Sequence, residues 1–172
     1  MAKTRIEHTF DCSEARLWQT LFFDDEFTRR LYIDTLRFPV WRVLEQKLTD
    51  ETLVRKVEVQ PLVENVPGPV RKILGDRFAY VEEGTLDRKR NRYRFRVVPS
   101  SMADKTQIAG EMYSEPSGES RVKRIVEIGV EVKIMMIGKI IEQKSIDDTR
   151  LSYDKMAAFL RTYLKEKPQS AP

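Results

Sequence analysis

The chain has 172 residues, of which 41% are hydrophobic and 34% charged, and this balance fits one globular domain rather than a disordered chain. It holds a single cysteine, Cys12, and a single histidine, His8, which excludes an internal disulfide and a cysteine-based zinc site. No GxGxxG, P-loop or HExxH motif occurs, so we expect no nucleotide, no metal and no other cofactor.

The sequence shows no sign of export or membrane insertion, so we expect a cytoplasmic protein. No stretch approaches the roughly 20 apolar residues that a membrane-spanning helix needs. The first ten residues, MAKTRIEHTF, alternate like a strand and lack the apolar core of a secretory signal.

The first predicted elements are one strand and two short helices. Residues 4–10 alternate in polarity, which predicts a strand. Ser13 is a good N-cap for a helix over residues 14–23, and the acidic residues 24–26 favour the start of a second helix that runs to about residue 36.

Six more strands and one long helix follow. Period-two patterns predict strands over residues 38–48, 52–60, 78–86, 92–98, 106–114 and 121–132, with a short helical piece at 70–74. Apolar residues recur at helical spacing from 136 to 165, which predicts an amphipathic helix of about eight turns. We assign residues 1–166 to a single domain and residues 167–172 to a polar C-terminal tail.

The order of these elements predicts an α+β fold. Strands that follow one another without intervening helices favour an antiparallel meander. We expect this sheet to curve and to bury its concave face against the long C-terminal helix, which is a helix-grip arrangement. A curved sheet and a straight helix cannot touch everywhere, so we expect a cavity between them.

Three stretches carry a resemblance to a known superfamily. Residues 10–18, FDCSEARLW, join an apolar strand end to a turn and a helix with a tryptophan; the others are residues 66–75, VPGPVRKILG, and 130–142, VEVKIMMIGKIIE. The chain resembles the START-like superfamily, which includes the plant Bet v 1 allergens and bacterial polyketide cyclase-type proteins, and the last two stretches resemble an uncharacterised bacterial branch. The resemblance implies a helix-grip fold with a hydrophobic cavity, but no single activity.

Strand alternation suggests which side chains face the cavity. Arg55, Glu82 and Arg124 are charged residues on otherwise apolar strand faces. Either they pair inside the cavity and orient the polar end of a ligand, or a bulge or a strand end places them in water. The predicted cavity residues on the strands are Trp41, Arg55, Val57, Phe78, Tyr80, Glu82, Met112, Arg124, Val126 and Ile128.

The middle of the long helix is more polar than its ends. If Ile141 and Met156 face the sheet, then Ser145, Asp148, Thr149 and Ser152 lie between them on nearly the same face. Such small polar residues would leave room for a ligand and supply hydrogen bonds to it. The alternative, equally compatible with the sequence, is that this part of the helix faces solvent.

The densest basic run covers residues 88–96, RKRNRYRFR, in which Arg92, Arg94 and Arg96 alternate with apolar residues. The simplest interpretation is a solvated outer face of the sheet, and the sharper one is a contact surface for anionic lipid headgroups. Nucleic acid is a less favoured partner, because the neighbouring rings of Tyr93 and Phe95 point to the opposite face.

Three functions remain open from sequence. The favoured one is binding or transfer of a hydrophobic small molecule, lipid-like or polycyclic, in the cavity. The second is a cyclase- or hydrolase-type enzyme that uses Asp148 or Glu82 in an apolar pocket. The third is a module that binds a partner protein in the same groove. With one histidine and no catalytic motif, the sequence favours binding, and it leaves the oligomeric state open.

Overall fold

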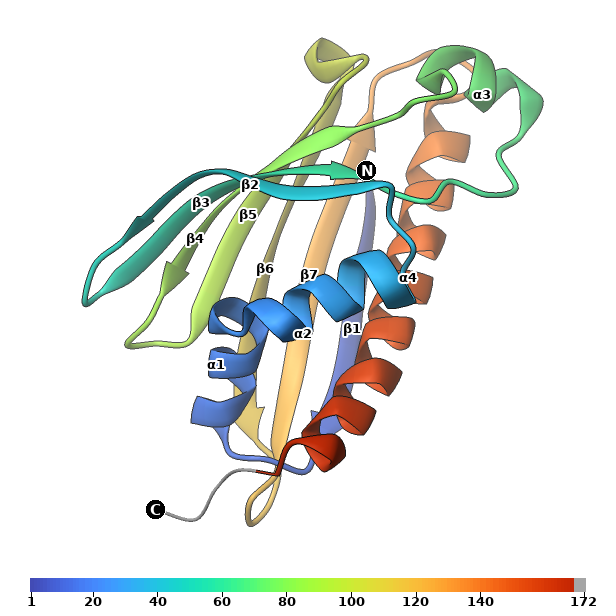
Figure 1. The fold of residues 1–172 in the computed structure, drawn as a ribbon. Helices are drawn as coiled ribbons and strands as arrows, with labels where there is room; N and C mark the ends of the chain where they lie inside the picture. Colours follow the sequence, from blue (N-terminus) through green and yellow to red (C-terminus); the bar gives the residue numbers. More distant parts are fainter. Residues whose placement is uncertain (169–172) are drawn as a thin grey trace.

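Seven antiparallel strands form one open, curved sheet in a computed structural model that describes residues 1–168 (Figure 1). Their order across the sheet is β1-β7-β6-β5-β4-β3-β2, so β1 and β2 are the two edges. The α+β helix-grip prediction is therefore confirmed. The strands are β1 (Ala2–Phe10), β2 (Val40–Leu48), β3 (Thr52–Gln60), β4 (Tyr80–Asp87), β5 (Arg92–Pro99), β6 (Thr106–Pro116) and β7 (Val122–Val132).

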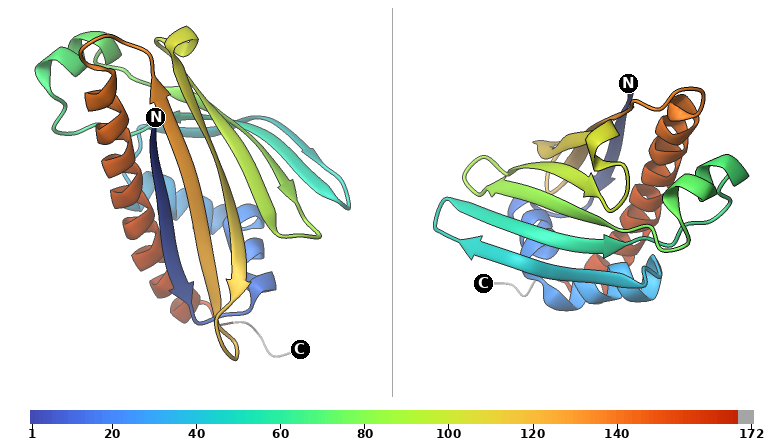
Figure 2. Two further views of the ribbon diagram at one scale, coloured as in Figure 1. Left: turned by 180° about the vertical axis from the view of Figure 1, so that it is seen from behind. Right: turned by 90° about the horizontal axis from the view of Figure 1, so that it is seen from above.

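The helices are distributed over the two ends of the concave side. The long helix α4 (Gly138–Glu166) runs beside β1 and β7 in both views of Figure 2, and α3 (Gly68–Leu74) lies near its first turns. The short helices α1 (Glu14–Phe23) and α2 (Asp25–Arg29) pack toward the other end of α4. A 3₁₀ turn, η2 (Ala103–Lys105), precedes β6.

Local capping explains where the short helices begin. The Ser13 side chain accepts a hydrogen bond from the Arg16 backbone N–H at 3.2 Å, as predicted for the N-cap of α1. Asp24 caps α2 in the same way, through Phe27 N–H at 3.0 Å. The predicted second helix is split in two, because residues after α2 form a π-helical turn, η1 (Arg30–Thr35). Such turns place a side chain differently from an α-helix, and this one carries Tyr32 to the interior.

Two apolar clusters divide the concave side. One lies where α1, α2 and the last turns of α4 meet the ends of β1 and β7, and its most deeply buried members include Phe10, Leu17, Phe27, Leu31 and Leu160. The other runs along the middle of the sheet and includes Trp18, Leu53, Met112, Val126 and Ile141. Within residues 1–168, none of the helices is long and apolar enough to cross a membrane.

Candidate functional site

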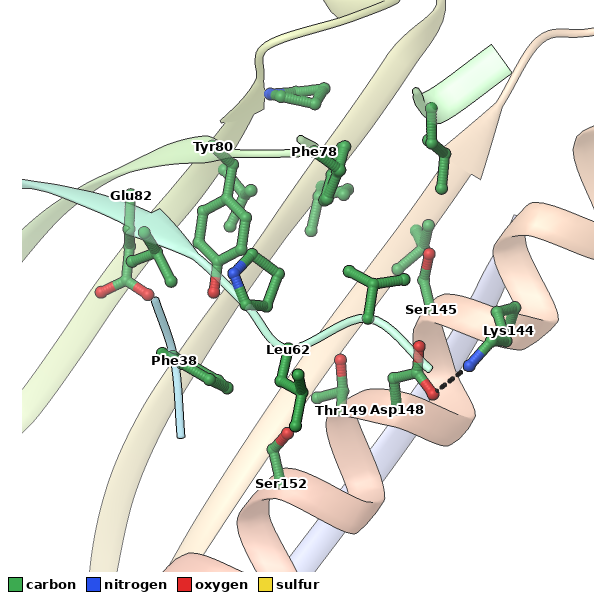
Figure 3. Close-up of a pocket in the computed structure, with 18 of the residues that line it drawn as sticks. Phe38, Leu62, Phe78, Tyr80, Glu82, Lys144, Ser145, Asp148, Thr149 and Ser152 are labelled. Atoms are coloured by element: carbon green, nitrogen blue, oxygen red, sulfur yellow. Dashed lines mark hydrogen bonds and ion pairs between the residues drawn. The ribbon is translucent and has the colours of Figure 1, made fainter. Parts of the chain in front are cut away.

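A cavity of about 250 Å³ lies between the concave face of the sheet and α4 (Figure 3). Side chains from β2 to β7 form one wall, and α4 forms the other. The lining is mostly apolar and rich in rings, which is typical of small-molecule sites. The rings are those of Tyr32, Phe38, Trp41, Phe78, Tyr80, Phe95 and Tyr153.

The segment between β3 and β4 completes the wall. Leu62 and Val63 line the cavity and are also 46% and 36% exposed, so they lie where the cavity meets solvent. Figure 3 shows Leu62 between the sheet residues and α4. Val66, Val70 and Leu74 follow at spacings of four residues. Sequence reasoning did not assign this segment to the cavity, although that spacing indicates one apolar helix face.

On the helix side, the polar middle of α4 faces the cavity. Ser145, Asp148, Thr149 and Ser152 all line it, and Figure 3 shows their side chains directed toward the sheet residues. The Lys144 ammonium donates to the Asp148 carboxylate at 2.5 Å, so these two charges largely compensate each other. The structure therefore places this stretch on the cavity wall and not on a purely solvated face.

On the sheet side, the main polar group is the Glu82 carboxylate. The Tyr93 hydroxyl donates to Glu82 Oε1 at 2.6 Å, and burial raises the pKa of Tyr93, so this hydroxyl stays protonated. The Tyr93 side chain reaches Glu82 by crossing Gly84, where a Cβ atom would lie 1.9 Å from the tyrosine oxygen. Burial also raises the pKa of Tyr80 well above its usual value, so its hydroxyl can donate to a ligand.

Arg55 lies behind this polar group. Its guanidinium stacks on the rings of Phe22, Trp41 and Tyr93 at 4.7, 5.8 and 5.5 Å from their centroids. Burial alone would lower the pKa of Arg55, but Tyr93 and Glu82 beside it outweigh that effect and raise it. The positive charge of Arg55 is thus balanced by the Glu82 carboxylate across Tyr93.

The structure brings most of the predicted cavity residues together around one cavity, on its sheet wall and its α4 wall. Those that line the cavity are Trp41, Val57, Phe78, Tyr80, Glu82, Ile128, Ile141, Ser145, Asp148, Thr149, Ser152 and Met156. Whether they contact a ligand stays a prediction.

Arg55, Met112, Arg124 and Val126 do not line the cavity in this structure, and whether any of them reaches a ligand stays a prediction. Met112 and Val126 are partners in the β6–β7 register, and Trp18 of α1 belongs to the same buried cluster. Phe22 of α1 covers Arg55. The prediction treated each strand face as uniform along its length, whereas α1 lies over Arg55, and Met156 and Tyr153 of α4 cover Arg124.

The three predicted interior charges do not pair with one another. All three are at least partly buried, so the alternative that placed them in water is also wrong. Glu82 accepts from Tyr93, Arg55 stacks on rings, and Arg124 donates to His8 and Met156. Among residues 1–168, no group of three or more His, Cys, Asp or Glu side chains could hold a metal ion.

The arginines of the basic strand are paired with carboxylates. Arg92 and Arg94 lie 2.7 and 3.5 Å from Glu111, and Arg96 lies 2.5 Å from Glu83. Arg94 and Arg96 are 73% and 69% exposed, which fits the solvated-face interpretation. Contact with anionic lipids stays a prediction.

Residues 5–164 match the model of a family described as "Protein of unknown function (DUF2505)", and no curated protein matches the chain. Several solved structures share the fold. An aromatase/cyclase from Streptomyces is 11% identical with a TM-score of 0.65, covering 99% of this chain and 100% of its own. Norcoclaurine synthase from Thalictrum flavum, in complex with dopamine and hydroxybenzaldehyde, is 13% identical with a TM-score of 0.65, covering 98% and 89%. A START superfamily protein from Mycobacterium smegmatis is 12% identical with a TM-score of 0.57, covering 95% and 97%. The START-like resemblance is thus confirmed at the level of the fold.

Proposed function

The chain belongs to the DUF2505 family, and from its cavity we propose that it binds a hydrophobic small molecule, lipid-like or polycyclic, between the sheet and α4. The observation that carries the proposal is an apolar, ring-lined cavity with hydrogen-bonding groups at only a few places on its wall. This composition is typical of sites that bury an apolar body and orient one polar end.

Burial of apolar surface would supply most of the affinity. A ligand that loses about 300 Å² of apolar surface to the cavity gains roughly 7 kcal/mol before the costs of association are subtracted. The rings restrict the shape of the ligand more than flexible aliphatic side chains would, since each keeps few rotatable bonds. The geometry therefore supports a ligand with an extended or fused apolar body.

The polar groups stand on opposite walls. Glu82 and Tyr80 come from β4, whereas the hydroxyls of Thr149 and Ser152 come from α4 (Figure 3). A ligand hydroxyl near the β4 wall can donate to the Glu82 carboxylate and accept from Tyr80. These few contacts orient the ligand, and the apolar wall holds it.

The first test is native mass spectrometry of the purified protein, followed by organic extraction. We expect a co-purifying lipid-like or polycyclic mass. The second test is titration with the neutral fluorescent probe N-phenyl-1-naphthylamine. Thr149→Phe places a ring in the cavity and should weaken probe binding by about tenfold or more.

Thr162→Phe is the matched control, because Thr162 is exposed on the same helix and does not line the cavity. It should leave probe binding unchanged. Equal binding by wild type, Thr149→Phe and Thr162→Phe would show that the probe does not enter the cavity. The proposal fails if, in addition, no ligand co-purifies.

A cyclase- or hydrolase-type activity is the second candidate, because one carboxylate, Glu82, lies on an otherwise apolar stretch of wall. Its Oε1 already accepts from Tyr93, so only the remaining lone pairs could take a proton from a substrate. Incubation with the co-purified compound and a search for a change in its mass would separate turnover from binding. We expect no change in mass and no effect of Glu82→Gln on the chemical identity of the ligand.

A further inference from the structure

The Arg124 guanidinium is completely buried, although no carboxylate within residues 1–168 lies at ion-pairing distance. Its Nη2 donates to His8 Nδ1 at 3.0 Å, and its Nη1 donates to the Met156 sulfur at 3.0 Å. Its Nε has no hydrogen-bond partner in the described chain. The rings of Phe10 and Tyr153 lie 5.3 and 5.1 Å from the guanidinium carbon.

These contacts do not compensate a full positive charge. A thioether is a weak acceptor, and His8 must be neutral at Nδ1 in order to accept. Asp154 bonds the other nitrogen of His8 at 2.8 Å, but its side chain is 67% exposed, so water screens its charge. Burial lowers the pKa of Arg124 to about 10, which still leaves it protonated at neutral pH.

A buried cation of this kind needs an explanation other than stability. Replacing a buried charged group by an apolar residue of similar volume is often neutral or stabilising. A guanidinium that an apolar side chain could replace without loss is therefore a candidate for recognition of an anion.

Of the charged side chains at or beside the cavity in residues 1–168, Arg124 is the one whose charge no nearby opposite charge balances. Lys144 pairs with Asp148 on the α4 wall, and Arg55 is balanced by Glu82 across Tyr93. One positive charge, that of Arg124, remains. A ligand with a single negative charge would balance it, whereas a phosphate with nearly two charges would exceed it.

Arg124 is also next to the cavity. Tyr153 and Met156 both line the cavity, and both contact the guanidinium from the other side. Methionine is unbranched and flexible, so its thioether can turn aside at small cost. A ligand group that reaches this end of the cavity can then take the place of the sulfur as the acceptor for Arg124 Nη1.

We propose that Arg124 binds the carboxylate of an amphiphile whose apolar body fills the cavity, with Met156 turning aside to admit it. The inference rests on the proposed function and adds the chemical class of the ligand. The carboxylate would accept from Nη1 of Arg124 in place of the Met156 sulfur, while Nη2 keeps its hydrogen bond to His8. An uncharged hydroxyl could accept the same hydrogen bond but would leave the charge uncompensated.

The test compares two ligands that differ only in the polar end, dodecanoate and dodecanol, as competitors of N-phenyl-1-naphthylamine. Near pH 8 the acid is ionised, and we expect wild type to bind it about tenfold more tightly than the alcohol. Arg124→Met should abolish this preference and change dodecanol binding by no more than about twofold.

Arg161→Met is the matched control, because Arg161 also lies over the Phe10 ring, at 5.4 Å, but is exposed. It should keep the preference for the acid. An equal affinity of wild type for the two ligands overturns the proposal without any variant, and so does a preference that survives in Arg124→Met. If neither ligand displaces a probe that Thr149→Phe excludes, the carboxylate proposal is overturned while the proposed function stands; the proposed function fails only by its own test.

Discussion

Gly84→Ala is expected to disrupt the polar side of the cavity, although Gly84 itself does not line the cavity. Gly84 lies in β4, and the Tyr93 side chain crosses it to reach Glu82. An added Cβ would lie 1.9 Å from the tyrosine oxygen and 2.2 Å from Cζ. Tyr93 cannot move away easily, because it is 3% exposed and packs against the rings of Phe22 and Phe95.

The magnitude follows from two losses. Overpacking of a well-packed core costs about 1–3 kcal/mol, and the Tyr93–Glu82 hydrogen bond is worth about 1 kcal/mol more. We therefore expect the free energy of unfolding to fall by roughly 2–4 kcal/mol. For a domain of this size the midpoint of thermal unfolding should fall by roughly 4–16 °C, measurable by calorimetry.

Gly129→Ala is the control, because it makes the same change in β7. There the nearest atoms to an added Cβ are Met1 Sδ at 3.7 Å and Lys3 Cγ at 3.9 Å, which are ordinary contacts. Alanine restricts the unfolded chain more than glycine, so this variant should be unchanged or more stable by about 0.5 kcal/mol. If the two variants unfold within about 0.5 kcal/mol of each other, the position of Tyr93 over Gly84 is wrong.

Three further predictions concern pH, the start of α4 and the basic strand. Burial lowers the pKa of His8; the charge of Arg124 lowers it further, while Asp154 opposes both effects. The folded state thus binds fewer protons than the unfolded chain, so the free energy of unfolding should fall as pH drops below about 6.5. His8→Asn keeps an acceptor for Arg124 and should flatten this dependence in urea titrations between about pH 7 and pH 5, whereas an identical slope would contradict the assignment. The Glu142 carboxylate accepts from the buried Val132 N–H at 2.8 Å, so Glu142→Ala should cost about 1–3 kcal/mol in chemical denaturation and Glu142→Gln clearly less. If the outer face of β5 binds anionic vesicles, replacing Arg92, Arg94 and Arg96 together by glutamate should abolish co-sedimentation with such vesicles. Unchanged sedimentation of the variant, or no sedimentation of wild type, would refute the membrane contact.

The strands and the long helix could be predicted because their patterns are local. Alternation in residues 4–10 and 121–132 matches β1 and β7 within two residues at each end, and the apolar spacing after residue 136 predicts α4. The π-helical turn at residues 30–35 could not be predicted, since its pattern of apolar residues also fits an α-helix. Residues 78 and 79 lie before β4 rather than within it, yet Phe78 still reaches the cavity.

The cavity wall could be predicted only in part, because it depends on which elements cover which half of the sheet. Alternation assigns Val126 and Ile128 to the same face, but Val126 is fully buried in the core and only Ile128 borders the cavity. Tyr32 and Tyr153 were missed, since one sits on the π-helical turn and the other on a helix whose facing partners sequence does not give. The local sequence pattern of a strand or helix does not determine how far the sheet lies from the helices that cover it.

The interior charges show the same limit and also what the sequence can supply. Their placement on apolar strand faces identified Arg55, Glu82 and Arg124 as exceptions, but not how each is compensated. Glu82 depends on Gly84, whose missing side chain admits Tyr93, and Arg124 depends on a neutral His8 and a sulfur. Of these two, only Arg124 keeps a charge that its neighbours do not compensate. If Arg124 is kept for recognition, Arg124→Met should lose the preference for a carboxylate while its thermal midpoint stays the same or rises. If Arg124 instead served packing, Arg124→Met would lower the thermal midpoint. A loss of the carboxylate preference without a loss of thermal stability is therefore expected only if Arg124 binds an anion.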